Sequence, residues 1–595
     1  MSKKMKHILG LLLLLVGLIG LTGCTLFSSD AEELPEDPAA VEEPQEPAVP
    51  ELTEEELLAI AQEERLQLEE TRKNELKEFY VPLPAIGEER EKVTTEAKAV
   101  YVTSNVAGFN FDIEDIEYYA DYVRSISGQT NNTVDTSRLG DVNKLERILG
   151  LCEASELNAL VIDVKNDDGL VSWPSDVPIV EEVGSNWTNV MPEYSVLLDY
   201  LKDHNIYSIA RIVAFKDPYF AKTKSEHAIQ LKNGGAYKDK KGIMWVNPFD
   251  PYVWDYNIAL SKEAALRGFD EIQYDYVRFP DNAKTYNPIT DFPYREGRDK
   301  DQAIESFLAH AKEELAPYNV NIAADVFGVA TRSWDDKPED IGQTWRLVAN
   351  QADYICPMIY PSHYGPNWYG YAVPDQHPYG VLRASLKEAL ERNAAQPEPA
   401  VIRPWIQGFN APWIAGHINY DAKAISDQIV AGVELGVNDY IIWDPSNSYD
   451  PMIFFYHDRV EDTWPEGEDV TGRTPEEALS KYLKAQKNDW LSQIYLLTPM
   501  DERAADYDEF AAQREETGMT LDSYDIVSVN KTDDGKWTAV LNATFTSNQG
   551  TAELTGAVVD IINEKDVYKV SLPELVFVNE QESETESEGS VEATE

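Results

Sequence analysis

Eight short apolar runs, rich in β-branched and aromatic residues, recur along most of the chain, and helical patterns lie between them. The runs are 99–105, 159–165, 208–215, 271–279, 321–328, 354–360, 402–409 and 439–445. The helical patterns include 141–155, 194–204, 252–267, 301–316 and 422–435. Strands that alternate with helices are joined by right-handed crossovers and form a parallel sheet. Eight such units predict an α/β fold, a (β/α)8 barrel of the TIM type enlarged by loops, over residues 96–460. A doubly wound open sheet is the alternative, although no Gly-rich fingerprint follows the first run.

The beginning of the chain predicts export across a membrane. Three lysines precede an apolar run at residues 8–21, which is too short for an ordinary spanning helix. The Leu-Thr-Gly-Cys sequence at 21–24 resembles the bacterial lipoprotein signal, which implies removal of residues 1–23 and a lipid on Cys24. We therefore expect a protein anchored by this lipid to the outer face of the bacterial cytoplasmic membrane. An uncleaved anchor or plain secretion is the alternative.

The charge balance excludes one class of partner. The chain has 51 Lys and Arg against 106 Asp and Glu, a net charge of −55. Binding to a nucleic-acid backbone needs cations that displace counterions, so we expect no nucleic-acid partner. Residues 24–52 are acidic and rich in proline, which predicts a disordered spacer, and the tail at 580–595 is acidic and equally unsuited to folding. Between them, 53–95 begins with a Thr-x-x-Glu capping box and predicts a helical lead-in.

After a linker at 461–473, residues 474–579 change in character. Helical patterns come first, and they are followed by alternating strands at 523–530, 537–547, 554–563 and 567–578. This order predicts a small α+β domain with an antiparallel sheet. The segment YLKAQKNDWLSQIYLLTP (482–499) resembles the helical opening of the nuclear-transport-factor-two-like cone fold.

Carboxylates stand at the ends of several predicted strands, where a barrel of this type places its site. Asp163, Asp275 and Asp325 follow apolar runs, and a pair of carboxylates is what hydrolysis of a glycosidic bond requires. Side chains alternate along a strand, so Asp275 shares the face of Glu271 and Gln273, which we expect to point into the barrel.

The segment GFDEIQYDYVRFP (268–280) resembles the fourth-strand motif of the bacterial putative glycosyl hydrolase domain family, which is related to the α-amylase-like enzymes. KNDDG (165–169), ADVFG (324–328), PMIYPSHY (357–364) and WIQGF (405–409) add to a resemblance that covers about 97–450. It implies that Asp275 is the nucleophile. The related enzymes place a glutamate acid on the next strand, where this chain departs from the pattern with Asp325.

Each carboxylate also has a structural interpretation. Asp275 could be the ion-pair partner of Arg278 or Arg211, and Asp325 could be a buried charge that orients Asp275. Asp163 is a second candidate for the acid or an orienting group, and its alternative is an ion pair with Lys165 or Arg211.

Polar and aromatic residues near the strand ends are candidates for contact with substrate, because flat rings suit the faces of sugars. The loop 362–380 is dense in aromatic residues and is either a glycan cleft or a packed lid. The candidate substrate-binding residues are Lys165, Arg211, Arg278, His363, Tyr364, Trp368, Trp405, Gln407, Trp443 and Asp444. The scattered histidines do not favour a metal site, a hard-cation site formed by Asp163, Asp167 and Asp168 is a weak alternative, and we expect no cofactor. The sequence thus predicts a glycoside hydrolase for an extracellular or cell-wall polysaccharide, and the alternative is a non-catalytic glycan-binding lipoprotein; it does not predict the oligomeric state.

Replacing Cys24 with serine tests the anchor. If the lipid on Cys24 holds the protein, Cys24→Ser should move it from the membrane fraction to the soluble fraction. No other segment of the sequence is long and apolar enough to replace the lost acyl chains. Fractionation of cells followed by immunoblotting measures this. A mutant that stays in the membrane pellet after a high-salt wash contradicts the lipoprotein hypothesis.

Overall fold

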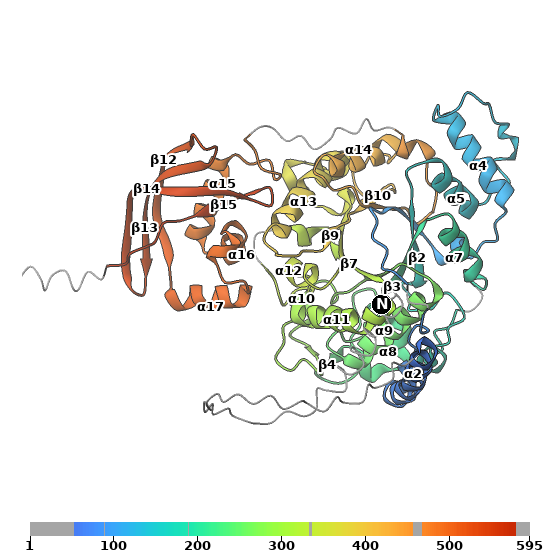
Figure 1. Cartoon of the computed structure of the whole chain (residues 1–595). Coiled ribbons are helices and arrows are strands. Elements are labelled where there is room, and N and C mark those ends of the chain that lie inside the picture. Colours follow the sequence, from blue (N-terminus) through green and yellow to red (C-terminus); the bar gives the residue numbers. More distant parts are fainter. Residues whose placement is uncertain (1–52, 88–89, 188–189, 333–335, 456–466, 579–595) are drawn as a thin grey trace, which may run out of the picture. The chain divides into compact units, whose positions relative to one another are not determined.

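The structure is a computed structural model, and it describes residues 53–87, 90–187, 190–332, 336–455 and 467–578 (Figure 1). The predicted signal peptide, Cys24, the spacer and the acidic tail lie outside the described residues. The chain divides into two units, 1–89 and 90–595. In the described part of the chain, every helix is too short or too polar to cross a membrane.

The first unit contributes one long helix, α2 (Glu54–Leu76). Thr53 caps it as the sequence predicts: the Thr53 hydroxyl accepts a hydrogen bond from the backbone N–H of Glu56 at 3.2 Å. The Glu56 carboxylate in turn accepts one from the Thr53 backbone N–H at 2.9 Å. This reciprocal capping box satisfies two backbone donors that a helix start leaves unpaired.

The second unit begins with a closed parallel barrel. Its strands are β1 (Lys98–Val102), β2 (Ala159–Lys165), β3 (Tyr207–Val213), β5 (Glu271–Asp275), β7 (Asn321–Phe327), β8 (Tyr354–Ile359), β9 (Val401–Ile402), β10 (Trp405–Gln407) and β11 (Tyr440–Trp443). The short strands β9 and β10 together occupy one position of the ring. Since β10 pairs with both β8 and β11, and β11 pairs with β1, the sheet closes on itself. The predicted (β/α)8 fold is confirmed.

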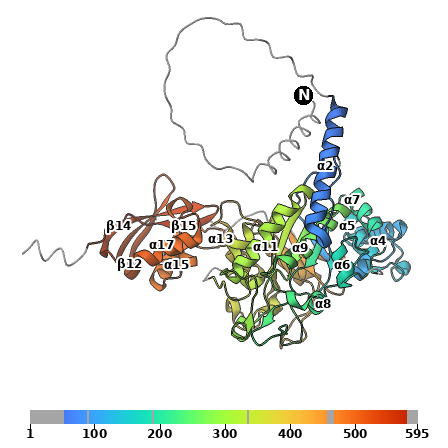
Figure 2. The ribbon, with the colours of Figure 1, turned by 90° about the horizontal axis from the view of Figure 1, so that it is seen from below.

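Helices connect the strands on the outside. The predicted ones are present as α5 (Lys144–Ala154), α7 (Tyr194–Asp203), α9 (Pro251–Arg267), α11 (Lys300–Leu315) and α14 (Ala422–Val433). Helices α9 and α11 lie side by side (Figure 1, Figure 2). Two long helices were not predicted, α4 (Ile113–Ile126) and α13 (Pro378–Asn393). Smaller helices complete the connections: α3 (Ser104–Ala107), α6 (Pro178–Val183), α8 (Pro218–Thr223), α10 (Ala283–Tyr286) and α12 (Trp345–Ala349). A two-stranded ribbon of β4 (Gln230–Leu231) and β6 (Thr290–Asp291) lies in the loops.

The inside of the barrel carries a polar layer at its amino-terminal end. Arg403 is fully buried and contacts Glu271 at 2.7 Å and Asp439 at 3.1 Å. Tyr207 donates a hydrogen bond to the second oxygen of Glu271 at 2.9 Å. On the opposite face of β5, the hydroxyl of Tyr274 lies 2.7 Å from that of Ser261 on α9. The alternation along β5 therefore points Glu271 inward and Tyr274 toward a helix.

The C-terminal region has the predicted α+β composition. Thr474 caps α15 (Pro475–Asn488) with a capping box, and α16 (Leu491–Leu497) and α17 (Tyr507–Thr517) follow. The strands β12 (Thr520–Lys531), β13 (Trp537–Ser547), β14 (Gly550–Glu564) and β15 (Val567–Ser571) form an antiparallel sheet in chain order. Its core includes Leu479, Leu483, Leu541, Phe545 and Val559. The cone-fold resemblance stays a prediction.

The turn after β2 requires a glycine. Gly169 has a φ of +83°, and a Cβ atom placed on it would lie 1.9 Å from Oδ1 of Asp217. Asp217 cannot easily move away, because it is buried and its carboxylate pairs with Lys165 at 2.8 Å and accepts from the backbone N–H of Phe220 at 2.8 Å. The final glycine of the KNDDG motif thus has a steric cause.

We expect Gly169→Ala to destabilise the barrel more than Gly234→Ala. Gly234 also has a positive φ, +94°, but its added Cβ would meet no heavy atom within 4 Å. Both variants carry the backbone strain, and only the first adds a clash, which costs roughly 1–3 kcal/mol more. Urea unfolding followed by circular dichroism measures the difference. Equal losses in the two variants would show that the contact with Asp217 relaxes freely.

Candidate functional site

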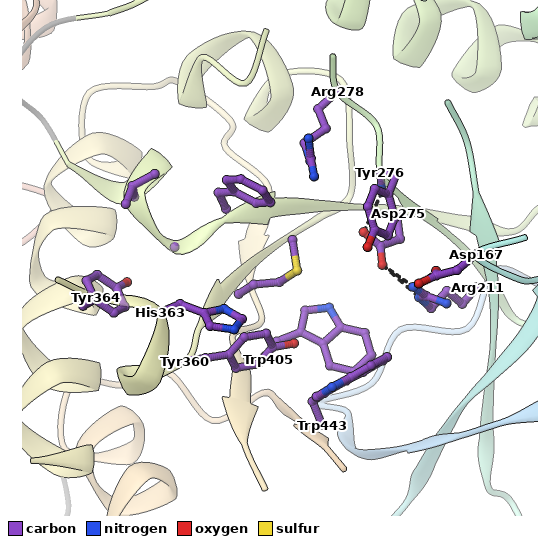
Figure 3. A pocket seen from close by; sticks show the side chains of 14 residues that line it. Asp167, Arg211, Asp275, Tyr276, Arg278, Tyr360, His363, Tyr364, Trp405 and Trp443 are labelled. Carbon is purple, nitrogen blue, oxygen red and sulfur yellow. Dashed lines mark hydrogen bonds and ion pairs between the residues drawn. The ribbon is translucent and has the colours of Figure 1, made fainter. Parts of the chain in front are cut away.

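A cavity of about 440 Å³ opens at the carboxyl-terminal ends of the barrel strands (Figure 3). This is the end at which barrels of this type hold their sites. The lining residues come from β3, β5, β7, β8, β10 and β11, from the loops that follow several of them, and from the loop after β2. They are Asp167, Arg211, Asp275, Tyr276, Arg278, Phe327, Gly328, Val329, Met358, Tyr360, His363, Tyr364, Trp405 and Trp443.

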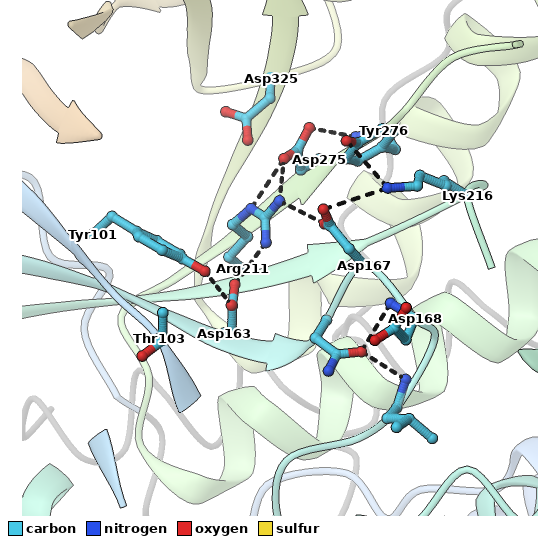
Figure 4. A network of polar contacts seen from close by, with 12 residues as sticks. Tyr101, Thr103, Asp163, Asp167, Asp168, Arg211, Lys216, Asp275, Tyr276 and Asp325 are labelled. Atoms are coloured by element: carbon cyan, nitrogen blue, oxygen red, sulfur yellow. Dashed lines mark hydrogen bonds and ion pairs between the residues drawn. The ribbon is translucent and has the colours of Figure 1, made fainter. Parts of the chain in front are cut away.

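Arg211 organises one wall of this cavity (Figure 4). Its guanidinium is 2% exposed and contacts three carboxylates. The Nε atom donates to Asp275 at 3.0 Å, Nη1 to Asp163 at 2.6 Å and Nη2 to Asp167 at 3.1 Å. Although burial opposes the charge, these neighbours raise the pKa of Arg211 well above its ordinary value, so it stays a cation. One cation therefore fixes carboxylates from two strands and one loop.

Asp275 ends β5 and lines the cavity. Arg211 holds one of its oxygens, and the other, Oδ1, accepts a hydrogen bond from the backbone N–H of Tyr276. Tyr276 has a φ of +49°, which is costly for a bulky residue. Its hydroxyl lies 3.3 Å from Nζ of Lys216. Both oxygens of Asp275 thus have a donor, and the carboxylate has a fixed orientation.

Asp325 lies one strand further, on β7, close to Asp275 (Figure 4). It is fully buried and is not among the residues that line the cavity. Its Oδ1 accepts a hydrogen bond from Nε1 of Trp405 at 2.7 Å, and its Oδ2 has no partner among the described residues. Burial, and next the charge of Asp275, raise the pKa of Asp325 well above its ordinary value. We infer that it keeps its proton at neutral pH.

Asp163 and Asp167 have different surroundings. Asp163 is buried between Arg211 and Tyr101, whose hydroxyl donates to it, and it does not line the cavity. Asp167 does line it. Although burial opposes the shift, the charges of Arg211 and Lys216 lower the pKa of Asp167, so it is ionised and unsuited to donate a proton.

Aromatic rings form the wall next to Arg211, whose central carbon lies 5.5 Å from the ring centre of Trp443. Tyr101 stacks on Trp443 with ring centres 4.1 Å apart, and Trp405 meets Trp443 edge-on at 5.5 Å. Tyr360 and His363 continue this wall, and their rings contact each other edge-on. Burial lowers the pKa of His363, so it is neutral at pH 7. Flat apolar faces beside the oriented carboxylate of Asp275 are suited to a sugar ring.

The cavity brings together seven of the predicted residues: Asp275, Arg211, Arg278, His363, Tyr364, Trp405 and Trp443. Tyr364 contributes its ring, while its hydroxyl lies 2.9 Å from Ser385 on α13. For Asp275 and Asp163, the predicted ion pair with Arg211 is present.

Four of the predicted substrate-binding residues do not line this cavity. Lys165 is fully buried against Asp217 and Asn257, because the strand register shifts between Asp163 and Lys165 and removes Lys165 from the inward face. The Gln407 amide donates to Asp375 and Phe409 inside the fold. The Asp444 carboxylate accepts from the backbone N–H groups of Ser446 and Ser448 and stabilises a turn. Trp368 lines a different cavity, where Arg332 lies 4.4 Å from its ring centre.

Sequence reasoning missed several cavity residues that lie at the end of a strand or directly after it, among them Tyr276, Phe327, Met358 and Tyr360. Their position at the strand ends was the available signal, but apolar and aromatic residues there are equally typical of the core. In the described part of the chain, no group of three or more His, Cys, Asp or Glu residues is arranged to hold a metal ion.

Comparison with known proteins gives one family. The sequence pattern described as "putative glycosyl hydrolase domain" matches residues 133–449, more than half of the chain. No curated protein matches. Among solved structures, a hypothetical protein from Ruminiclostridium thermocellum ATCC 27405 is 32% identical, over 38% of this chain and 97% of that one, with a TM-score of 0.29.

Two further structures are similar at low identity. The glycoside hydrolase domain of PgaB (BpsB) from Bordetella bronchiseptica is 14% identical, over 59% of this chain and 95% of that one, with a TM-score of 0.38. The glycoside hydrolase domain of PelA from Pseudomonas aeruginosa is 12% identical, over 50% of this chain and 92% of that one, with a TM-score of 0.29.

Because the pKa of Asp325 is raised, we expect its contribution to the free energy of unfolding to decrease as pH rises. Between the ordinary carboxyl pKa and the raised one, the folded state binds more protons than the unfolded state, so this residue makes stability fall as pH rises. Asp325→Asn removes that contribution. Its melting temperature relative to wild type should therefore increase from pH 4 to pH 7, by the equivalent of up to about 1.4 kcal/mol per pH unit. A difference that is constant with pH would mean that Asp325 titrates normally.

Proposed function

Because the chain belongs to the putative glycosyl hydrolase domain family, we propose that it hydrolyses glycosidic bonds of an extracellular or cell-wall polysaccharide. The observation that carries the proposal is an oriented carboxylate, Asp275, at the wall of a cavity that aromatic rings also line. The carboxylate supplies the attack that glycoside hydrolysis needs, and the rings supply a platform for the sugar.

Asp275 acts as the nucleophile, or as the base that activates water. Its partner Arg211 donates a hydrogen bond to one oxygen and directs the carboxylate, and the N–H of Tyr276 holds the second oxygen. A charge fixed in this way does not have to be reoriented during the reaction, which is the main electrostatic advantage of an enzyme site over water.

Asp325 holds the proton that the leaving oxygen requires. It is the neighbour of Asp275, and burial keeps it protonated. In the structure its carboxyl lies behind the cavity wall, bonded to the Trp405 indole. Proton donation therefore requires Asp325 or Trp405 to shift when substrate binds. Contacts of catalytic groups in free enzymes often tighten only in the complex.

The rest of the chain fits a surface enzyme. The Leu-Thr-Gly-Cys sequence supports attachment through a lipid on Cys24, and the acidic spacer at 24–52 separates the anchor from the folded part. The C-terminal α+β domain, with its resemblance to the nuclear-transport-factor-two-like fold, is proposed as an accessory domain.

One observation favours the non-catalytic alternative. Asp275 shares a buried cation with Asp163 and Asp167, as a purely structural carboxylate would. A glycan-binding protein needs only the aromatic wall, so the two functions differ in what the loss of the Asp275 charge does.

Replacing Asp275 with asparagine separates these functions. Hydrolysis of a polysaccharide that the wild type cleaves should fall by about a thousandfold or more, because the nucleophile or base is lost. Binding of the same polymer should change little, whereas the melting temperature should fall because buried Arg211 loses a carboxylate partner, so both assays are run where the variant is folded. Asp199→Asn, an exposed change on α7, is the matched control and should keep full activity.

In the same assay, Asp325→Asn should lose less activity on substrates whose leaving groups need no protonation. Wild-type turnover in Asp275→Asn argues against the mechanism. Unchanged binding with no hydrolysis of any polymer by the wild type favours the glycan-binding alternative.

A further inference from the structure

A second arginine, Arg278, lies at the cavity and has few partners of its own. It follows β5 by three residues and is 4% exposed. Its Nη1 atom donates to the carbonyl of Phe279 at 2.8 Å and lies 3.1 Å from Asp281. Its Nε and Nη2 atoms have no hydrogen-bond partner among the described residues. Figure 3 shows the guanidinium directed toward the cavity.

Aromatic rings surround this guanidinium. The ring centres of Phe327, Trp245 and Tyr276 lie 4.3, 5.1 and 5.1 Å from its central carbon. Rings stabilise a guanidinium through its faces and keep water from them, but they leave its hydrogen-bonding edge free. The free edge of Arg278 is therefore held in one orientation in a poorly hydrated place.

Arg278 has fewer carboxylate partners than Arg211. Arg211 is equally buried, and its Nε, Nη1 and Nη2 atoms all donate to carboxylates of the chain. Arg278 has one carboxylate, Asp281, which is 57% exposed, so solvent weakens that pair. Asp275 lines the same cavity, but both of its oxygens already accept hydrogen bonds, from Arg211 and Tyr276, and His363 is neutral. A buried cation without full compensation is costly, and an anion from outside would remove that cost.

We propose that Arg278 binds a carboxylate carried by the substrate, so that the polysaccharide contains acidic sugars. That the carboxylate belongs to a polysaccharide rests on the proposed function, whereas the binding of a carboxylate by Arg278 does not depend on it. A planar carboxylate matches the Nε and Nη2 edge with two parallel hydrogen bonds, whereas a neutral carbonyl offers a single acceptor oxygen and no charge. Arg278 is thus a specificity-determining residue.

The net charge of −55 does not oppose this assignment. Exposed charges are screened within about 8 Å at physiological ionic strength. The contact with Arg278 forms inside a cavity, where screening by salt is weak. The acidic surface slows the approach of an acidic polymer, while the buried guanidinium selects the sugar that enters.

The test uses acetate and acetamide as probes, since they share a shape and differ in charge. In protein labelled with [15N]arginine, acetate should shift the Nε–H signal of Arg278 and bind roughly tenfold more tightly than acetamide. Arg278→Met should abolish acetate binding at the cavity, and Arg278→Lys should retain part of it. Arg138→Met, an exposed arginine outside the cavity, is the matched control and should bind acetate as the wild type does. Equal binding of the two probes, or acetate binding that survives in Arg278→Met with a folded barrel, overturns the proposal.

A second measurement keeps this inference separate from the proposed function. The wild type should cleave a uronic-acid polysaccharide at least tenfold more efficiently than the same polymer after chemical reduction of its carboxyl groups, and Arg278→Met should lose that preference. Acetate selectivity without any hydrolysis supports the site and contradicts the hydrolase. Equal hydrolysis of the two polymers with no acetate selectivity supports the hydrolase and contradicts the site.

Discussion

The buried guanidinium of Arg211 is the interaction on which the candidate site depends. Asp163 and Asp275 extend from strands on either side of β3, and Asp167 from the loop after β2, and all three meet this one cation. Three carboxylates in a poorly hydrated space would repel one another and take up protons. Arg211 lies between them and donates a hydrogen bond to each, so their positions are fixed. The cation therefore holds the strand ends together and, by the same contacts, orients Asp275.

A second buried arginine lies between carboxylates at the amino-terminal end of the barrel interior. Arg403 is fully buried between Glu271 and Asp439, far along the strands from the cavity. β5 takes part in both layers, because Glu271 and Asp275 share its inward face. A mostly apolar interior would have closed the barrel as well. The two polar layers instead fix how the strands are aligned, and this alignment decides which side chains reach the cavity.

The sequence predicts the barrel because its signals are strong and local. Each buried strand is an apolar run, and alternation along β5 places Asp275 correctly. The predictions that differ from the structure concern contacts between residues far apart in the sequence, which no local pattern contains. Asp163 and Lys165 are two residues apart and should share a face, but the register shift between them sends Lys165 toward α9. The predicted loop 362–380 overlaps the start of α13, because Pro378 and Gly380 are typical of a loop, although proline is also favoured at the first position of a helix. Burial of Asp325 behind Trp405 depends on packing, which follows only from the folded structure.

The backbone at Tyr276 links the two halves of the site. A positive φ at a residue with a bulky side chain costs on the order of 1–3 kcal/mol, so the surrounding structure has to maintain it. Three contacts do so: its N–H donates to Asp275, its ring faces Lys216 at 4.4 Å, and Arg278 lies 5.1 Å from the same ring. The turn that this residue makes ends β5 directly after Asp275 and returns the chain so that Arg278 also reaches the cavity. The strain therefore accompanies a single turn that brings Asp275, the proposed nucleophile, and Arg278, the proposed carboxylate-binding residue, to the same cavity.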